Sequence, residues 1–149
     1  MPIQASIPTD AETPNSTERT RAVVRAYIEA LQRGDIDALR TSFAADATWW
    51  VSGRLPVSGT WHGPDGILDG FLGAVVARLD SDAPVTQELT SLVADGETAL
   101  AEWTSRAISA RGQAYENHYA VVFTVRDGLV AAVREYFDTE VMREVLFAT

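Results

Sequence analysis

Glu135, Asn117 and Tyr119 have residue types and spacing suited to acid–base chemistry in an apolar site. In an extended strand, side-chain alternation places Glu135 on one face together with Val133 and Phe137. A carboxylate on an apolar face loses hydration, which raises its pKa toward the range useful for general acid–base catalysis. The same alternation places Asn117 and Tyr119 on one face, where they could orient a ligand oxygen. The alternatives are an ion-paired, structural Glu135 and a hydrogen-bonded core pair.

Other aromatic and histidine residues are candidates for ligand contacts. Tyr27 lies on an apolar helix face and could reach a pocket with its hydroxyl, although such residues are more often core. His62 lies in a glycine-flanked loop and could act as an acid or base near neutral pH. The adjacent Trp49 and Trp50 must point to opposite faces of a strand, so one would line a pocket. His118 alternates away from its neighbours and is expected on the outer face.

The composition argues against several kinds of site. The 149 residues contain no cysteine and two histidines, which disfavours disulfides, thiolate nucleophiles and a dedicated metal site. The net charge of −9 disfavours a nucleic-acid or anionic membrane partner. The first residues lack the features of a secretory signal, and no window approaches the roughly 20 apolar residues of a membrane span. We therefore expect a cytoplasmic protein.

Helical periodicity predicts three helices in the first half of the chain. Asn15 can cap the first, with Glu18 completing a capping box, and Gly34 ends it. Asp35 can cap a short second helix, and a third, with an apolar stripe that includes Phe71, is expected to begin near Pro64. A single strand is predicted between the second and third helices, over residues 47–52.

After Pro84 the period changes from helical to alternating. Four long strands are expected, over residues 85–94, 97–109, 114–125 and 129–138. Asp95-Gly96 and Asp127-Gly128 predict tight hairpins between them. A terminal helix could occupy residues 139–147. The order of elements indicates an α+β fold, with residues 1–14 as a disordered tail and residues 15–149 as a single domain.

Several local strings resemble the nuclear transport factor two-like (NTF2-like) superfamily, and the SnoaL-like and ketosteroid isomerase-like domains in particular. They lie at residues 27–31, 34–39, 43–48, 59–63, 117–119 and 127–138. The resemblance implies a cone-shaped, curved antiparallel sheet wrapped around three N-terminal helices, with a pocket in the open end. It also implies that the face of the last strand bearing Glu135 looks into that pocket. A bulge would place Asp138 there instead.

This sequence retains only some of the catalytic residues of two related families. Tyr27 falls at the tyrosine position of the ketosteroid isomerases, but Val51 and Val121 replace their two aspartates. Glu135 matches one carboxylate of the limonene-epoxide hydrolases, whose other polar groups are replaced. The resemblance therefore leaves Glu135, Tyr119 and Asn117 as catalytic candidates. The residues expected to bind the ligand are Tyr27, Trp49, Val51, His62, Phe71, Trp103, Ser105, Val121, Val133 and Phe137.

Three functions are compatible with these features. The first is a cofactor-independent, metal-free enzyme of the isomerase, cyclase or dehydratase type. It would transfer a proton on a small apolar oxygenated metabolite such as a polyketide or terpenoid. The second is a non-catalytic small-molecule-binding or scaffolding domain, and the third an epoxide hydrolase with a rearranged site. Relatives commonly form dimers through the outer sheet face, so we expect a homodimer.

Overall fold

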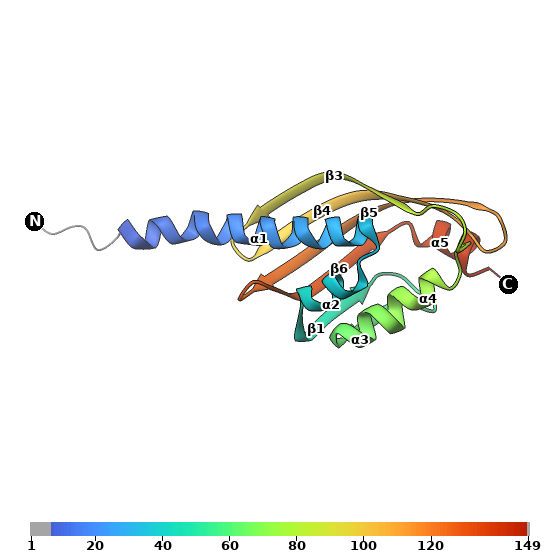
Figure 1. Cartoon of the computed structure of the whole chain (residues 1–149), viewed down its shortest axis with the longest axis horizontal. Helices are drawn as coiled ribbons and strands as arrows, with labels where there is room; N and C mark the ends of the chain where they lie inside the picture. The colour runs from blue at the N-terminus through green and yellow to red at the C-terminus, as the bar shows by residue number, and fades with distance from the viewer. Residues whose placement is uncertain (1–6, 149) are drawn as a thin grey trace, which may run out of the picture.

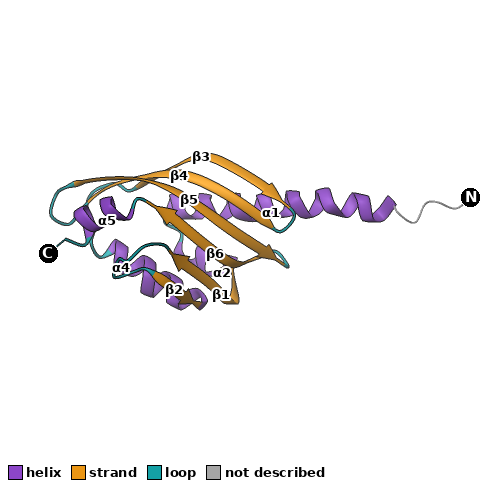
Figure 2. Ribbon diagram, turned by 180° about the vertical axis from the view of Figure 1, so that it is seen from behind, coloured by secondary structure: helices purple, strands orange, loops and turns teal. Residues whose placement is uncertain are grey.

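A computed structural model describes the backbone of residues 7–148 and the side chains of residues 16–148. Helices cover one face of a single curved sheet, so that the sheet stands behind the helices in Figure 1 and in front of them in Figure 2. The helices are α1 (Ile7–Arg33), α2 (Ile36–Ser42), α3 (Gly63–Asp65), the π-helical η2 (Gly66–Leu72), α4 (Gly73–Val76) and α5 (Thr139–Leu146). The strands are β1 (Phe43–Val51), β2 (Gly59–His62), β3 (Thr86–Asp95), β4 (Thr98–Ile108), β5 (Ala114–Arg126) and β6 (Leu129–Phe137). This is the α+β fold predicted from the sequence.

The six strands form one sheet in the order β2-β1-β6-β5-β4-β3. The expectation of a purely antiparallel sheet was wrong, because β1 runs parallel to β6. No hairpin joins these two neighbouring strands. In the sequence they are separated by β2, by helices α3, η2 and α4, and by β3 to β5, so no turn sets their relative direction. The short strand β2 was also missed. It lies in a segment rich in glycine and proline, and pairs with β1 through Trp49 and Trp61.

The predicted meander is confirmed, with strand ends within one residue of those expected. Asp127 and Gly128 both have positive φ, at 53° and 76°, as a type I′ hairpin turn requires. In the other tight hairpin the turn residues are Gly96 and Glu97, because Asp95 still pairs with Thr98 at the end of β3. The alternation of buried and exposed residues along β4 and β5 is nearly unbroken, which gives the sheet one core face.

Helix α1 begins at Ile7, eight residues before the predicted cap at Asn15, so residues 7–14 are not the tail that we expected. Pro8 lies in the first turn, where a helix tolerates a missing N–H. The prediction for residues 1–6 lies outside the described residues. Two threonines join α1 to the β3–β4 turn: the Thr20 hydroxyl donates to the Gly96 carbonyl (2.6 Å), and the Gly96 amide donates to Thr17 (2.9 Å).

The third helix is divided into α3, η2 and α4, and the wider π-helical turn of η2 brings Ile67, Leu68 and Phe71 into the interior. The terminal helix α5 is confirmed. Its N-cap is Asp138, whose carboxylate accepts hydrogen bonds from two backbone amides of the first turn. Asp138 is therefore engaged outside the interior, and no bulge exchanges it with Glu135.

The core fills the half of the curved sheet that lies toward the N-terminal part of α1. Phe123 is fully buried there, and its ring lies 5.5 Å from that of Tyr27 and 6.3 Å from that of Trp49. Beyond these rings the other half of the sheet is not filled by side chains. Within residues 7–148, no helix has the length and apolarity to cross a bilayer.

Candidate functional site

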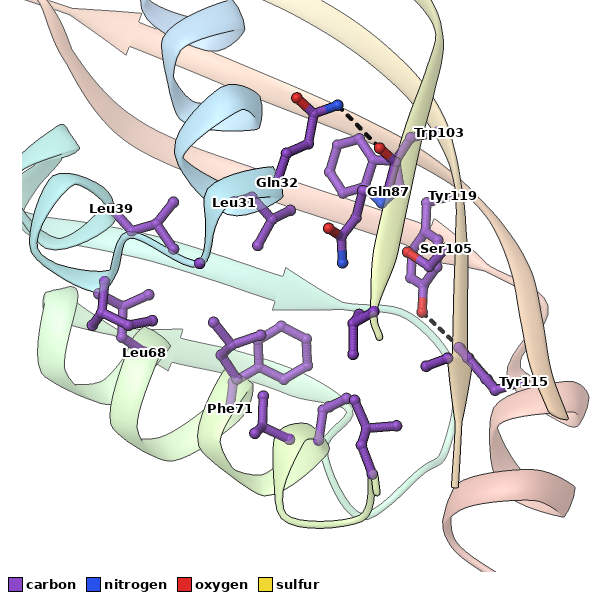
Figure 3. A pocket seen from close by; sticks show the side chains of 18 of the residues that line it. Leu31, Gln32, Leu39, Leu68, Phe71, Gln87, Trp103, Ser105, Tyr115 and Tyr119 are labelled. Atoms are coloured by element: carbon purple, nitrogen blue, oxygen red, sulfur yellow. Dashed lines mark hydrogen bonds between the residues drawn. The ribbon is translucent and has the colours of Figure 1, made fainter. Parts of the chain in front are cut away.

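A cavity of about 530 Å³ occupies the half of the sheet that the core leaves open. Its walls come from the C-terminal end of α1, the helices α2, η2 and α4, and the strands β3, β4 and β5 (Figure 3). Glu135 of β6 and Trp49 of β1 close its inner end, next to Tyr27. The volume is that of a site for a small organic ligand.

Glu135 is buried, with 4% of its surface exposed, and lines this cavity. Its Oε1 accepts a hydrogen bond from the Trp49 indole N–H at 2.6 Å. No ion pair among residues 16–148 includes Glu135. Burial raises the pKa of Glu135 to about 7, while the Trp49 hydrogen bond acts in the opposite direction. The carboxyl is therefore poised to gain or lose a proton near neutral pH.

The second carboxylate oxygen of Glu135 opens on the cavity. It accepts no hydrogen bond from any residue between 16 and 148. In the same part of the chain, no side-chain nitrogen or oxygen that is sealed from solvent lacks a partner. The oxygen must therefore be accessible, and the cavity is the space next to it. A ligand can thus reach the lone pairs of a desolvated carboxylate.

Tyr27 stands beside Glu135 on the helical side of the cavity. Its ring packs against Trp49 and edge-on against Phe43 and Phe123. Burial, and next the negative charge of Glu135, raise the pKa of the Tyr27 hydroxyl well above its ordinary value. The phenol therefore keeps its proton near neutral pH and can donate a hydrogen bond to a ligand.

Tyr115 and Tyr119 form a phenol pair on β5, and their oxygens lie 2.6 Å apart. The side-chain amide of Asn117 donates to the Tyr115 oxygen at 2.8 Å. Burial raises the pKa of Tyr115 to about 12, although its hydrogen bonds to Tyr119 and Asn117 lower it, and raises that of Tyr119 well above its ordinary value. Two phenolic protons serve one internal hydrogen bond, so one O–H remains to donate to a ligand oxygen.

Asn117 lies behind this pair and does not line the cavity. Its Nδ2 also donates to the Asp138 carbonyl (2.9 Å), and its Oδ1 accepts from the backbone amides of His118 (2.9 Å) and Asp138 (3.2 Å). All its polar atoms are engaged with protein, and 1% of its surface is exposed. Asn117 therefore positions Tyr115 and the start of α5, and is not free to contact a ligand as we had expected.

The structure separates the other predicted residues into two groups. Those that line the cavity are Tyr27, Trp49, Phe71, Trp103, Ser105, Tyr119 and Glu135. Those that do not are Val51, His62, Asn117, Val121, Val133 and Phe137. The three valines are packed in the hydrophobic core. His62 is exposed at the end of β2, because it pairs with Thr48, which neighbours the inward-facing Trp49. Phe137 packs on Tyr119 and borders a depression next to His118.

Tyr115 and Gln87 are among the lining residues that the sequence analysis did not single out. Tyr115 shares the face of Asn117 and Tyr119, so alternation along the predicted strand could have identified it. Gln87 faces inward from β3, where its register partner is Ser105. Among the residues that the structure describes, no three acidic or histidine side chains gather in a way that could hold a metal ion.

Comparisons with known proteins agree with this architecture. A family profile for the SnoaL-like domain matches residues 24–133. The uncharacterized protein Rv0034 of Mycobacterium tuberculosis is 29% identical over 126 residues, which are 85% of this chain and 94% of that protein. An NTF2-like protein from Burkholderia xenovorans is 25% identical with a TM-score of 0.72, over 88% of this chain and 98% of that one. An LEH-like epoxide hydrolase from M. tuberculosis, 22% identical, has the same fold, with a TM-score of 0.68 over 88% of this chain and 91% of that one.

Proposed function

The chain belongs to the SnoaL-like domain family, within the NTF2-like superfamily, and on this premise we propose that it is an enzyme of proton transfer. The substrate is a small, largely apolar, oxygenated molecule, and the reaction is an isomerisation, cyclisation or dehydration that uses neither a metal nor an organic cofactor. The observation that carries this proposal is Glu135, a buried carboxyl that opens on the cavity and has no ionic partner among residues 16–148.

Glu135 acts as the base in the proposed reaction. Its carboxylate takes a proton from a carbon next to a substrate carbonyl, and the C–H bonding electrons move into the enolate. A phenol O–H, from Tyr27 or from the Tyr115–Tyr119 pair, donates to the enolate oxygen and stabilises its charge. Glu135 then returns the proton to another carbon or to a leaving hydroxyl. The carboxyl ends in its starting state, so each cycle is balanced in protons.

The activity is tested with nitrobenzisoxazole, a flat apolar probe of general bases. A base removes its ring C–H proton, the N–O bond breaks, and a coloured cyanonitrophenolate is released. We expect kcat/KM to rise with pH through an apparent pKa near 7 and then level off, because the ionised Glu135 is the reactive form. Glu135→Gln should lower it by about 100-fold or more. Glu29→Gln, an exposed carboxylate on α1, should leave it unchanged. A wild-type rate no faster than buffer, or equal rates for wild type and Glu135→Gln, would contradict the proposal.

A Trp49→Phe variant tests, in the same assay, whether the pKa of the rate profile is that of Glu135. Trp49→Phe removes the N–H donor that stabilises the Glu135 carboxylate and keeps an aromatic ring among Tyr27, Phe71 and Phe123. The apparent pKa of the rate profile should therefore rise. Trp61→Phe is the control, because the indole N–H that it removes donates to the Val57 carbonyl. The apparent pKa of its rate profile should equal that of wild type. Equal profiles for both variants would show that Trp49 does not act through Glu135.

The two alternatives predict different outcomes. A non-catalytic binding domain would bind apolar ligands without accelerating any proton transfer, and the loss of most polar groups of related enzymes favours it. An epoxide hydrolase with a rearranged site would incorporate oxygen from labelled water into a diol. The similarity of fold to an LEH-like epoxide hydrolase favours that test, although this chain replaces the polar groups of the limonene-epoxide hydrolases other than the carboxylate that Glu135 matches.

We also propose that the protein acts as a cytoplasmic homodimer that pairs through the outer face of the sheet. Tyr136, with 42% of its surface exposed, packs edge-on against Trp50 on that face, and the register pair Leu100 and Val93 is exposed on the same face, on β4 and β3. A second copy would cover this apolar area. Sedimentation should give a dimer for wild type and a monomer for Tyr136→Lys. A wild-type monomer at micromolar concentration would contradict the proposal.

A further inference from the structure

Polar side chains form a diagonal stripe across four adjacent strands of the cavity wall. On β6, Glu135 pairs with Val121 of β5, so Tyr119 is its diagonal neighbour on the same face. Tyr119 pairs with Trp103 of β4, so Ser105 is the next diagonal neighbour. Ser105 pairs directly with Gln87 of β3. We call Glu135, Tyr119, Ser105 and Gln87 the polar stripe. It runs from the inner end of the cavity to its rim.

Every member of the stripe lines the cavity, and most of its polar capacity is unused by the protein. Glu135 has one free oxygen, and the phenol pair has one free O–H. The Ser105 hydroxyl, on a residue that is 9% exposed, and the side-chain amide of Gln87 form no hydrogen bond with residues 16–148. Figure 3 shows Gln87, Ser105 and Tyr119 along the sheet side, with Gln32 of α1 holding the backbone carbonyl of Gln87 at 3.0 Å. Alpha-helix α1 thus fixes the outer end of the stripe.

The side chains that helices α2, η2 and α4 present to the cavity, opposite the stripe, are all apolar. Figure 3 shows Leu39, Leu68 and Phe71 on that side. The other lining residues of these helices are Ile36, Ile67, Leu72, Val75 and Val76. A ligand in this space meets hydrogen-bonding groups along one edge and apolar groups along the other. An isolated polar group against the helical wall would lose hydration without a partner.

We infer that the ligand is an elongated, flat molecule with hydrogen-bonding oxygens along one edge and uninterrupted hydrocarbon along the opposite edge, lying across β6, β5, β4 and β3. The stripe crosses three gaps between strands of about 4.8 Å each, so it spans roughly 14 Å perpendicular to the strands. Its diagonal neighbours are separated by about 7–8 Å. The ligand oxygens are therefore several bonds apart, as on a fused-ring skeleton. This inference rests on the proposed function in using the same cavity, and it concerns binding.

Two isomeric diols test the inference by calorimetric titration of the full chain. Naphthalene-2,7-diol carries both hydroxyls on one long edge, whereas naphthalene-2,6-diol carries them on opposite edges, with the same formula and apolar area. We expect the 2,7 isomer to bind about tenfold more tightly, the difference that one additional hydrogen bond gives. Equal affinities, tighter binding of the 2,6 isomer, or no binding of either would overturn the inference.

Substitutions in the polar stripe test whether the preference for the 2,7 isomer depends on its side chains. Ser105→Ala should reduce the preference for the 2,7 isomer, and Tyr119→Phe combined with Ser105→Ala should abolish it. Thr104→Val, a neighbouring change on β4 whose hydroxyl contacts His118 on the outer face, should leave it intact. A preference that survives the double variant would overturn the inference. Reaction with nitrobenzisoxazole without an isomer preference would support the proposed proton transfer and overturn the inference about the stripe. An isomer preference without reaction would support the inference and contradict the proposed function.

Discussion

Replacing Glu135 with glutamine should stabilise the folded chain above pH 7 and change its stability little below about pH 4. The folded-state pKa of Glu135 is about 7, above the ordinary value of 4.5. Between these values the folded state holds a proton that the unfolded state has released, so stability falls as pH rises through this window and then levels off. The full difference amounts to about 3 kcal/mol. Glutamine stays neutral and can still accept the Trp49 hydrogen bond, so it avoids this loss.

Urea denaturation at a series of pH values, for wild type, Glu135→Gln and Glu29→Gln, measures this effect. The free energy of unfolding of Glu135→Gln minus that of wild type should increase between about pH 4 and pH 7. The Glu29→Gln curve should run parallel to wild type, because Glu29 is exposed on α1. A difference for Glu135→Gln that does not vary with pH would show that Glu135 titrates at its ordinary pKa.

The same experiment bears on why the chain keeps a carboxyl at this position. A buried, ionisable group without an ionic partner lowers stability near neutral pH, and a neutral isostere would remove that cost. Sites that combine such a cost with access to a ligand are where acid–base groups are found. A Glu135→Gln variant that is more stable than wild type but inactive would show that the same carboxyl lowers stability and is required for the reaction.

The parts of the fold with local signals were predictable from the sequence. Alternation placed Glu135 on one face with Val133 and Phe137, and the family resemblance implied that this face looks inward. His118 was expected on the outer face, and both assignments agree with the burial pattern along β5 and β6. The aspartate–glycine pairs marked the hairpins because tight hairpin turns need positive φ values, which glycine adopts readily and aspartate tolerates. The expected list of ligand-contacting residues included Trp49, which lines the cavity beside Glu135.

Features that depend on distant partners were not predictable. The four-residue strand β2 owes its existence to pairing with β1, and nothing within residues 59–62 requires a strand. The parallel pairing of β1 with β6 depends on how the whole chain closes. Local capping preference also misplaced the start of α1. For the site, alternation gives the face of a side chain but not its partners, and this distinction decides the role of Asn117.

Asn117→Ala should be the most destabilising single change in the site, at about 3–5 kcal/mol. The asparagine is 1% exposed and makes four hydrogen bonds, to the Tyr115 hydroxyl, to both backbone polar groups of Asp138 and to the His118 amide. Alanine leaves those buried groups without partners, and each such loss costs about 1–3 kcal/mol. It also releases the N-cap of α5, since Asp138 is held in place by this side chain.

Ser105→Ala is the matched control, because Ser105 pairs with Asn117 across the strands and faces the same interior. Its hydroxyl bonds to no described residue, so this change should cost less than about 1 kcal/mol. Thermal and urea unfolding of both variants measure the contrast. An Asn117→Ala variant as stable as wild type but devoid of activity would contradict the positioning role and indicate that Asn117 takes part in the reaction. A large loss of stability, with residual activity that still depends on Glu135, would instead establish it as the residue that holds β5, the phenol pair and α5 together.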